Sequence, residues 1–122
     1  MAAPNLVNVS SIYGKTMGAA LSTTTTTSLL ANASGSNKLL KINSIIVSNV
    51  DGSNAADATI SWYNGTTDYR LARTVAVPAD STLVVIGKDP PIYLEENHSI
   101  RGGASAASDL EIVISYEELD DA

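Results

Sequence analysis

The chain has 122 residues, a formal net charge of −6 and no cysteine. Its length suits one compact domain and is too short for two of ordinary size. The absence of cysteine excludes disulfides, thiolate catalysis and cysteine-bound zinc, and it fits a protein that folds in a reducing cytoplasm. Seven Lys and Arg residues against thirteen Asp and Glu give no basic footprint for phosphate backbones, which argues against nucleic-acid binding.

Hydrophobic residues make up 44% of the chain, yet the sequence has no Phe and one Trp. We therefore expect a thin core of aliphatic side chains. Ser and Thr are frequent and charged residues make up only 16%, a composition that suits strands better than helices. The N-terminus lacks a basic segment followed by an apolar run, and no window is long enough to span a bilayer, so we expect neither a secretory signal nor a membrane partner.

The first predicted elements are extended segments. Residues 1–14 alternate weakly in hydrophobicity and end at Gly14, which indicates an extended N-terminal arm or a first strand. Five consecutive threonines, Thr23 to Thr27, precede two leucines. Because β-branched residues restrict the backbone to extended forms, this run is interpreted as a strand, with a linker as the alternative, and residues 33–37 are interpreted as a loop.

The segment from Leu39 to Tyr63 is expected to be the scaffold of the fold. Ile45 and Val47 break the alternation of the residues before them, which predicts a central strand that is covered on both faces or carries a β-bulge near Ser44. Residues 51–54 are rich in turn formers and are predicted to close a hairpin loop.

Two further strands are predicted after this loop. Period-two spacing gives each of them one apolar face, and Asn64-Gly65 between them is a strong hairpin signal. The first of these faces consists of Ala56, Ala58, Ile60 and Trp62, and the second of Tyr69, Leu71, Arg73, Val75 and Val77.

Shorter strands complete the chain. Thr82 to Ile86 is a fully apolar run of the buried-strand type, and two prolines make residues 87–91 a rigid corner. Short strands are expected over residues 92–95 and 99–101, and the small residues 102–108 are interpreted as a flexible segment. The clearest amphipathic strand is the last, in which Leu110, Ile112, Ile114 and Tyr116 alternate with Glu111, Val113, Ser115 and Glu117.

No window of the chain shows a helical stripe, and the spacing of about eight short strands predicts an all-β, single-domain β-sandwich. We expect a jelly-roll-like arrangement or, as an alternative, an immunoglobulin-like one. The sandwich is expected over residues 15–119, after an arm or first strand over residues 1–14 and before an acidic tail over residues 120–122. The acidic side chains of residues 117–122 are interpreted as solvated.

The residue types of an active site do not gather in this sequence. His98 is the one histidine, lies in a polar turn without HxxH or HxxE spacing, and is interpreted as a solvated turn residue. The adjacent glutamates at 95–96 and 117–118 would point to opposite faces of a strand. Residues 51–54 lack the spacing of a calcium loop. We therefore expect no enzymatic activity, no catalytic residue, no cofactor and no metal.

Three stretches carry a resemblance to a known family: IYGKT at Ile12 to Thr16, PPIYLEENHSIR at Pro90 to Arg101, and ISYEEL at Ile114 to Leu119. From about Ser11 to Leu119 the chain resembles small β-rich virion structural proteins of tailed bacteriophages, which are common among marine and cyanobacterial phages. The resemblance implies a virion location and brings no catalytic residues.

Within a virion, the resemblance implies a capsid decoration or cement protein, which binds the outer capsid surface and stabilises the shell. A tail, baseplate or head-fibre adaptor module is the alternative, and a carbohydrate-binding module is a second one. The expected partners are the major capsid protein and sister copies, in a homotrimer or alternatively a homodimer. The protein would be synthesised in the host cytoplasm and located on the capsid exterior.

The N-terminal segment is the candidate interface with the capsid or with a sister subunit. Extended residues there could add backbone hydrogen bonds to a neighbouring chain while their apolar side chains are buried. The candidate interface residues are Leu6, Val9, Ile12, Tyr13 and Lys15.

Overall fold

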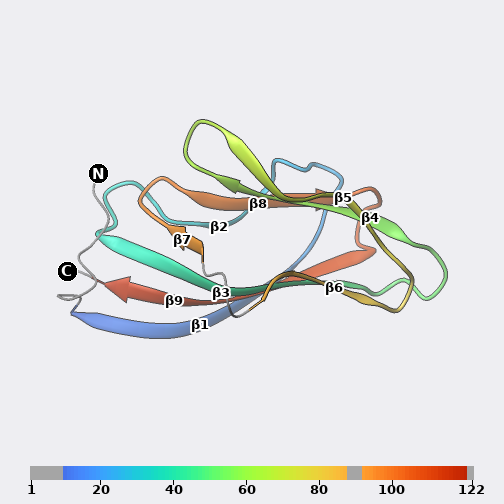
Figure 1. The fold of residues 1–122 in the computed structure, drawn as a ribbon, viewed down its shortest axis with the longest axis horizontal. Helices are drawn as coiled ribbons and strands as arrows, with labels where there is room; N and C mark the ends of the chain where they lie inside the picture. Colours follow the sequence, from blue (N-terminus) through green and yellow to red (C-terminus); the bar gives the residue numbers. More distant parts are fainter. Residues whose placement is uncertain (1–9, 88–91, 121–122) are drawn as a thin grey trace.

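The computed structural model describes residues 10–87 and 92–120. Within these residues the chain forms nine β-strands and no helix, arranged as two antiparallel sheets that face each other (Figure 1). The strands are β1 (Ser11–Ala20), β2 (Ser28–Ala31), β3 (Lys38–Asn49), β4 (Ala56–Tyr63), β5 (Asp68–Val77), β6 (Thr82–Ile86), β7 (Ile92–Leu94), β8 (Ser99–Ala104) and β9 (Leu110–Asp120).

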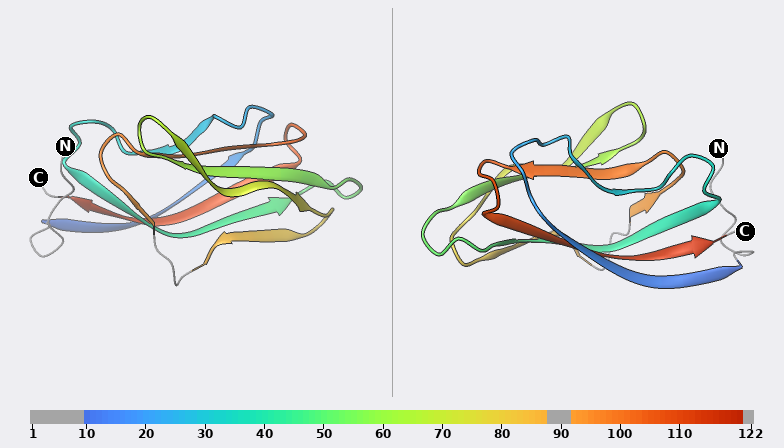
Figure 2. Two further views of the ribbon diagram at one scale, coloured as in Figure 1. Left: turned by 45° about the horizontal axis from the view of Figure 1, so that its top comes forward. Right: turned by 180° about the vertical axis from the view of Figure 1, so that it is seen from behind.

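The strand order is that of a jelly roll. Sheet A has the order β1-β9-β3-β6, with β7 also paired to β3, and sheet B has the order β2-β8-β4-β5 (Figure 2). The first strand therefore pairs with the last strand. In an immunoglobulin-like sandwich the first strand would pair with the second. The predicted all-β sandwich is confirmed, in its jelly-roll form.

The core between the sheets is made of aliphatic side chains. Ile42, Ile45 and Val47 of β3 lie beside Ile112 and Ile114 of β9, and all five are fully buried. Burial of such a side chain contributes about 1.5–3 kcal/mol relative to exposure. Sheet B adds Ala56, Ala58, Ile60, Val77, Ile100 and Ala104 to the same cluster.

The central strand and its bulge are confirmed. One edge of β3 pairs with β9, and the other pairs with β6 and β7. The register against β9 shifts between Ile42 and Ser44, so that Asn43 is an extra residue. The bulge brings Ile42 and Ile45 to the same buried face although they are three positions apart.

The last strand is confirmed in its alternation, and the acidic tail is corrected. Leu110, Ile112 and Ile114 are buried, whereas Glu111 and Val113 are exposed. Residues 117–120 belong to β9 and pair with β1 and β3, so they are not a solvated tail. Charge alone does not decide whether a strand end is paired. Residues 121–122 lie outside the described residues.

The connection over residues 51–54 is not a hairpin, because it crosses from β3 in sheet A to β4 in sheet B. The Asp51 carboxylate accepts a hydrogen bond from the backbone N–H of Ser53 at 2.9 Å, and this bond lowers the pKa of Asp51. The Asn49 side chain donates to the carbonyl oxygens of Asn54 and Val77. The same turn chemistry serves a hairpin and a sheet crossing, and the sequence could not distinguish them.

The hairpin at Asn64-Gly65 is confirmed, but the predicted face of β5 is wrong. The register between β4 and β5 shifts twice, and Thr74 has a positive φ of 47°. As a result Ala72 is the buried residue opposite Ile60, while Arg73 is exposed.

Two predictions about small and β-branched residues are wrong. Thr23 to Thr27 forms a loop, and β2 begins only at Ser28. Gly102, Gly103 and Ala104, predicted as flexible, are buried residues of β8. The threonine loop runs beside β8, where the N–H of Gly102 donates to the carbonyl of Thr27 at 3.0 Å. The close approach of the loop backbone to β8 explains both why the threonine run is a loop and why the small residues of β8 are buried.

The predicted buried strand over Thr82 to Ile86 is an edge strand. It forms β6 at the border of sheet A, and Val84 is 61% exposed. An apolar run does not indicate burial on both faces when the strand lies at an edge.

Candidate assembly interface

The open edge of sheet A is formed by β1. This strand pairs with β9 along its whole length, from Ser11 opposite Asp120 to Ala20 opposite Glu111. The N–H of Leu21 donates to the carbonyl of Leu110 at 2.9 Å, which fixes the phase of the ladder. Odd-numbered residues of β1 therefore bond to β9. The backbone N–H and C=O groups that point to the open edge are those of Ile12, Gly14, Thr16, Gly18 and Ala20.

Small side chains accompany these outward backbone groups. A Cβ added at Gly14 would meet nothing within 4 Å, and one added at Gly18 would meet only the carbonyl oxygen of Ile112 at 3.6 Å. Neither glycine has a positive φ. Nothing among the described residues therefore requires glycine at these positions. The sequence interpretation missed this feature, although the period-two series Gly14, Thr16, Gly18, Ala20 is visible in the sequence.

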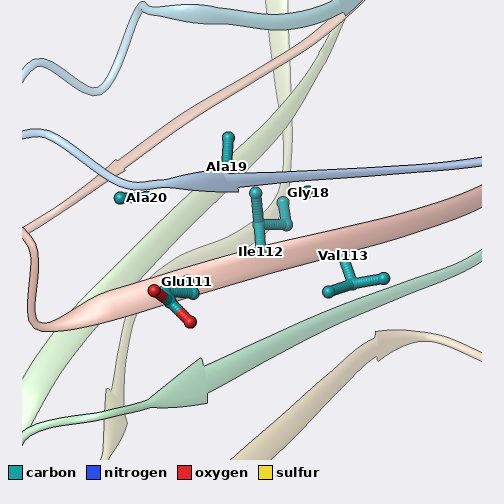
Figure 3. A pocket seen from close by; sticks show the side chains of 6 residues that line it. All are labelled: Gly18, Ala19, Ala20, Glu111, Ile112 and Val113. Atoms are coloured by element: carbon teal, nitrogen blue, oxygen red, sulfur yellow. The ribbon is translucent and has the colours of Figure 1, made fainter.

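A hollow of about 290 Å³ lies along β1 and β9 (Figure 3). The only charged side chain that lines it is that of Glu111. A small-molecule site needs several polar groups that converge on the ligand, and this hollow lacks them. The hollow is therefore a feature of the protein surface beside β1 and not a ligand site. The lining residues are Gly18, Ala19, Ala20, Glu111, Ile112 and Val113.

The predicted interface residues divide into two groups. Ile12 is 58% exposed and Tyr13 is 49% exposed, both near the start of β1. Lys15 lies on the same strand, and its Nζ is 3.1 Å from Oε1 of Glu118. Leu6 and Val9 lie outside the described residues. The structure thus places Ile12, Tyr13 and Lys15 together on β1.

The ammonium group of Lys15 pairs with a carboxylate that it shares with a second lysine. Oε2 of Glu118 lies 3.3 Å from Nζ of Lys38. The hydrogen bond and the charge of Glu118 raise the pKa of Lys15. Burial acts to raise the pKa of Glu118, but hydrogen bonds from both lysines outweigh it, and the pKa is lowered. The ammonium group of Lys15 is therefore paired with a carboxylate on the neighbouring strand β9.

The other sheet edges are interrupted or short. β2 has four residues, β6 has five and β7 has three. β5 has ten residues, but its register against β4 shifts twice. β1 has ten residues and no register shift. Proteins protect open edges by shortening or bulging them, and of the strands in residues 10–87 and 92–120 only β1 is left long and regular at an edge.

An aromatic cluster lies at one end of sheet B. The Trp62 ring is half-buried, with the Tyr69 ring centroid at 5.8 Å and the His98 ring centroid at 5.2 Å. His98 accepts a hydrogen bond at Nδ1 from the backbone N–H of Glu95 at 3.2 Å. Its interpretation as a solvated turn residue is therefore corrected, because the ring packs on Trp62 and ties its own turn together.

The remaining aromatic side chain of this end is covered. The Arg101 guanidinium lies 3.6 Å from the centroid of the Tyr63 ring and 3.0 Å from Oδ2 of Asp68. Tyr69, at 54% exposure, is the large exposed ring of this group. A sugar platform needs open ring faces, and most of these faces are occupied by neighbouring side chains.

Acidic side chains do not converge on a catalytic centre in the part of the chain that the structure describes. No group of three or more His, Asp or Glu residues there could hold a metal ion. Glu96 is buried, and its carboxylate accepts hydrogen bonds from the backbone N–H groups of Gly35 and Asn37. Glu117 lies 3.7 Å from Lys41. No helix of the described residues could cross a membrane.

Over the described residues, the fold and this edge define the class of the protein: a jelly-roll sandwich in which the long strand β1 lies at an open edge. Comparisons with known proteins give only distant similarities. No family model matches the chain, and no curated protein matches it.

Solved structures that are similar to the chain include the following three. One is described as "Bacillus endospore appendages form a novel family of disulfide-linked pili", with 14% identity, 91% of this chain and 89% of that chain covered, and a TM-score of 0.48. Two are described as pentameric capsid proteins isolated from metagenomic phage sequences. The first has 16% identity, 97% and 68% coverage and a TM-score of 0.37. The second has 18% identity, 97% and 63% coverage and a TM-score of 0.39. Because these scores are low, none assigns a function to this chain.

Proposed function

We propose that this protein is a structural component of a tailed-phage virion, and specifically a capsid decoration or cement protein on the outer shell. The observation that carries the proposal is the exposure of Ile12 and Tyr13 beside the open edge of β1. Exposed aliphatic and aromatic side chains next to unpaired backbone groups are typical of a surface that binds another protein chain. The resemblance to phage virion proteins over residues 11–119 supports the virion location.

The binding mode follows from the chemistry of β1. A strand of a sister copy would pair with its outward N–H and C=O groups, and the exposed side chains of Ile12 and Tyr13 would become buried against the capsid. Leu6 and Val9 precede them in the sequence and are proposed as further apolar contacts. Lys15 remains paired with Glu118, so β1 presents no isolated charge to the contact. Its affinity should therefore depend little on salt concentration.

Self-association would strengthen this binding. A capsid offers many identical sites at symmetry axes, and a homotrimer or homodimer can engage several of them at once. The net charge of −6 is compatible with the capsid exterior, where no contact with the packaged nucleic acid is needed.

The proposal is tested by co-sedimentation with shells assembled from the major capsid protein alone. Replacement of both Ile12 and Tyr13 by Ser should lower the affinity by at least about tenfold, because each buried side chain contributes about 1.5–3 kcal/mol. The matched control is Val84→Ser, at the opposite edge of sheet A, where the side chain is 61% exposed. Unchanged binding of the double variant, or no binding of the natural chain, would overturn the proposal.

Copy number distinguishes a decoration protein from a tail, baseplate or head-fibre adaptor. Densitometry of purified virions should give a copy number comparable to that of the major capsid protein, whereas an adaptor would be far rarer. Binding to a glycan array, lost in Tyr69→Ala, would instead favour the carbohydrate-binding alternative.

A further inference from the structure

We infer that β1 pairs with β1 of a second copy, antiparallel about a two-fold axis, so that sheet A continues across the pair. This inference deepens the self-association in the proposed function. It rests on the proposed interface at β1 and not on the virion location.

The first argument is the contrast between the edges. Among residues 10–87 and 92–120, no strand lies beside the outward backbone groups of β1, and β1 is not shortened or bulged. It also lacks the usual charged protection, because Lys15, its one charged residue, is held by Glu118. An edge of this kind is a template for another strand.

The second argument is that β1 can pair with itself in only a few ways. The outward groups belong to even-numbered residues, so even-numbered residues of one copy must lie opposite even-numbered residues of the other. This happens only when the two-fold axis passes through a residue of the strand and not between two residues. An axis at Lys15 would align residues 11–19 but would set the two lysines directly opposite each other, which is unfavourable. An axis at Thr16 aligns residues 12–20 and avoids this repulsion. Axes farther along the strand give shorter overlaps.

The side chains suit the register centred on Thr16. Tyr13 would lie opposite Ala19 of the second copy, so that a large side chain meets a small one. Gly14 would lie opposite Gly18, and Lys15 opposite Met17. Cross-strand pairs of this kind leave no like charges opposed and no bulky side chains in collision.

Symmetry favours a dimer over a trimer by this route. In a two-fold contact, each of the two copies contributes the same edge, β1. A ring of three copies joined by strand pairing would need a second edge on each copy, and the other edge of sheet A is the short pair of strands β6 and β7. The structure therefore favours the homodimer.

The register is tested by single-cysteine variants, which the absence of natural cysteine makes unambiguous. In Thr16→Cys the two Cα atoms would be about 5.5 Å apart across the axis, within the range that a disulfide spans. In Ile12→Cys the two would be separated by about 27 Å. We expect covalent dimers from Thr16→Cys under mild oxidation and none from Ile12→Cys. Equal cross-linking of the two variants, or none in either, would overturn the inference.

The hydrogen bonds are tested with proline. Thr16→Pro removes an outward N–H without removing a backbone hydrogen bond to β9, and the side-chain contact with Ser115 that it loses is lost in Thr16→Val as well, so the variant should keep its fold by circular dichroism and become monomeric. Thr16→Val keeps the N–H and should remain dimeric. Sedimentation equilibrium should give twice the 12.7 kDa of one chain for the natural protein and for Thr16→Val. A natural protein that is monomeric at every concentration, or a dimeric Thr16→Pro, would overturn the inference.

These results are separable from those of the shell-binding experiment. A monomeric protein that binds shells through Ile12 and Tyr13 would disprove the dimer and retain the proposed function. A β1 dimer that does not bind shells would retain the dimer and disprove the proposed function. If Thr16→Pro fails to fold, the cysteine pair still decides the register.

Discussion

Gly102 has no room for a side chain. An added Cβ would lie 2.6 Å from Cδ1 of Ile60 and 2.8 Å from the carbonyl oxygen of Thr59. At the neighbouring Gly103 it would lie 2.7 Å from the carbonyl oxygen of Thr24. Backbone atoms cannot move aside as the end of a side chain can. Glycine is therefore needed here for close packing and not for flexibility.

Gly102→Ala should lower the free energy of unfolding by about 1–3 kcal/mol, because the new methyl group overpacks the sheet. Urea denaturation measures the change. Gly14→Ala is the matched control, since its Cβ would meet nothing within 4 Å, and its effect should stay within about 0.5 kcal/mol. Equal effects of the two substitutions would contradict the packing explanation.

Glu118 should make the stability depend on pH. Its pKa is lowered in the folded state, so its stabilising contribution is present above the unfolded pKa of about 4.3 and is lost as the pH falls through the folded pKa. Glu118→Gln should therefore be less stable than the natural chain at neutral pH, and this difference should shrink under acid conditions.

Urea midpoints measured from neutral pH into the acid range check this expectation. Glu111→Gln, an exposed position on the same strand, is the control and should follow the natural chain throughout. A difference between Glu118→Gln and the natural chain that is independent of pH would show that the carboxylate charge is not responsible.

At the scale of elements, the bulge in β3 accommodates one extra residue without changing which residues reach the core. Asn43 is the extra residue between Ile42 and Ser44, and it allows Ile42 and Ile45 to share one face. Without it the remaining residues would alternate regularly, with the same side chains buried. The bulge is therefore a local irregularity that leaves the order of the buried residues intact.

Deletion of Asn43 should be tolerated better than deletion of Ile46. The second deletion makes Ile45 and Val47 consecutive, so one of them must leave the core, at a cost of about 1.5–3 kcal/mol. The deletion at Asn43 should cost clearly less. Thermal and urea unfolding of both variants measure the difference, and an equally damaged Asn43 deletion would show that the bulge is required for the bend of the strand.

The sequence predicted individual strands better than it predicted their partners. The alternation of β9 and the break in β3 were visible because each residue's face depends on its immediate neighbours. The crossing at residues 51–54 and the edge position of β6 depend on strands far away in the chain. The threonine run was wrong because extended propensity does not show whether a pairing partner is available.

At the scale of the whole molecule, both sheets share one core. Trp62, the only tryptophan, reports on sheet B, whereas Ile112 lies in sheet A. Because buried side chains of the two sheets belong to one cluster, we expect them to unfold together.

Ile112→Val should lower the free energy of unfolding by about 0.5–1.5 kcal/mol. The shift should be the same when unfolding is followed by Trp62 fluorescence or by far-UV circular dichroism. Val113→Ala, on the exposed face of the same strand, is the control and should have a smaller effect. Transitions that differ between the two probes would show that the sheets unfold separately.

The sequence by itself determined the all-β class, the aliphatic core and the bulge near Ser44, because these follow from composition and local periodicity. Only the tertiary structure decided that β1 pairs with β9 and leaves its even-numbered backbone groups at an open edge. The physical reason is that a strand's pattern specifies which side chains face the core, whereas its backbone hydrogen bonds can be satisfied by any suitable strand. The choice among partners is made when the whole sandwich closes around its core.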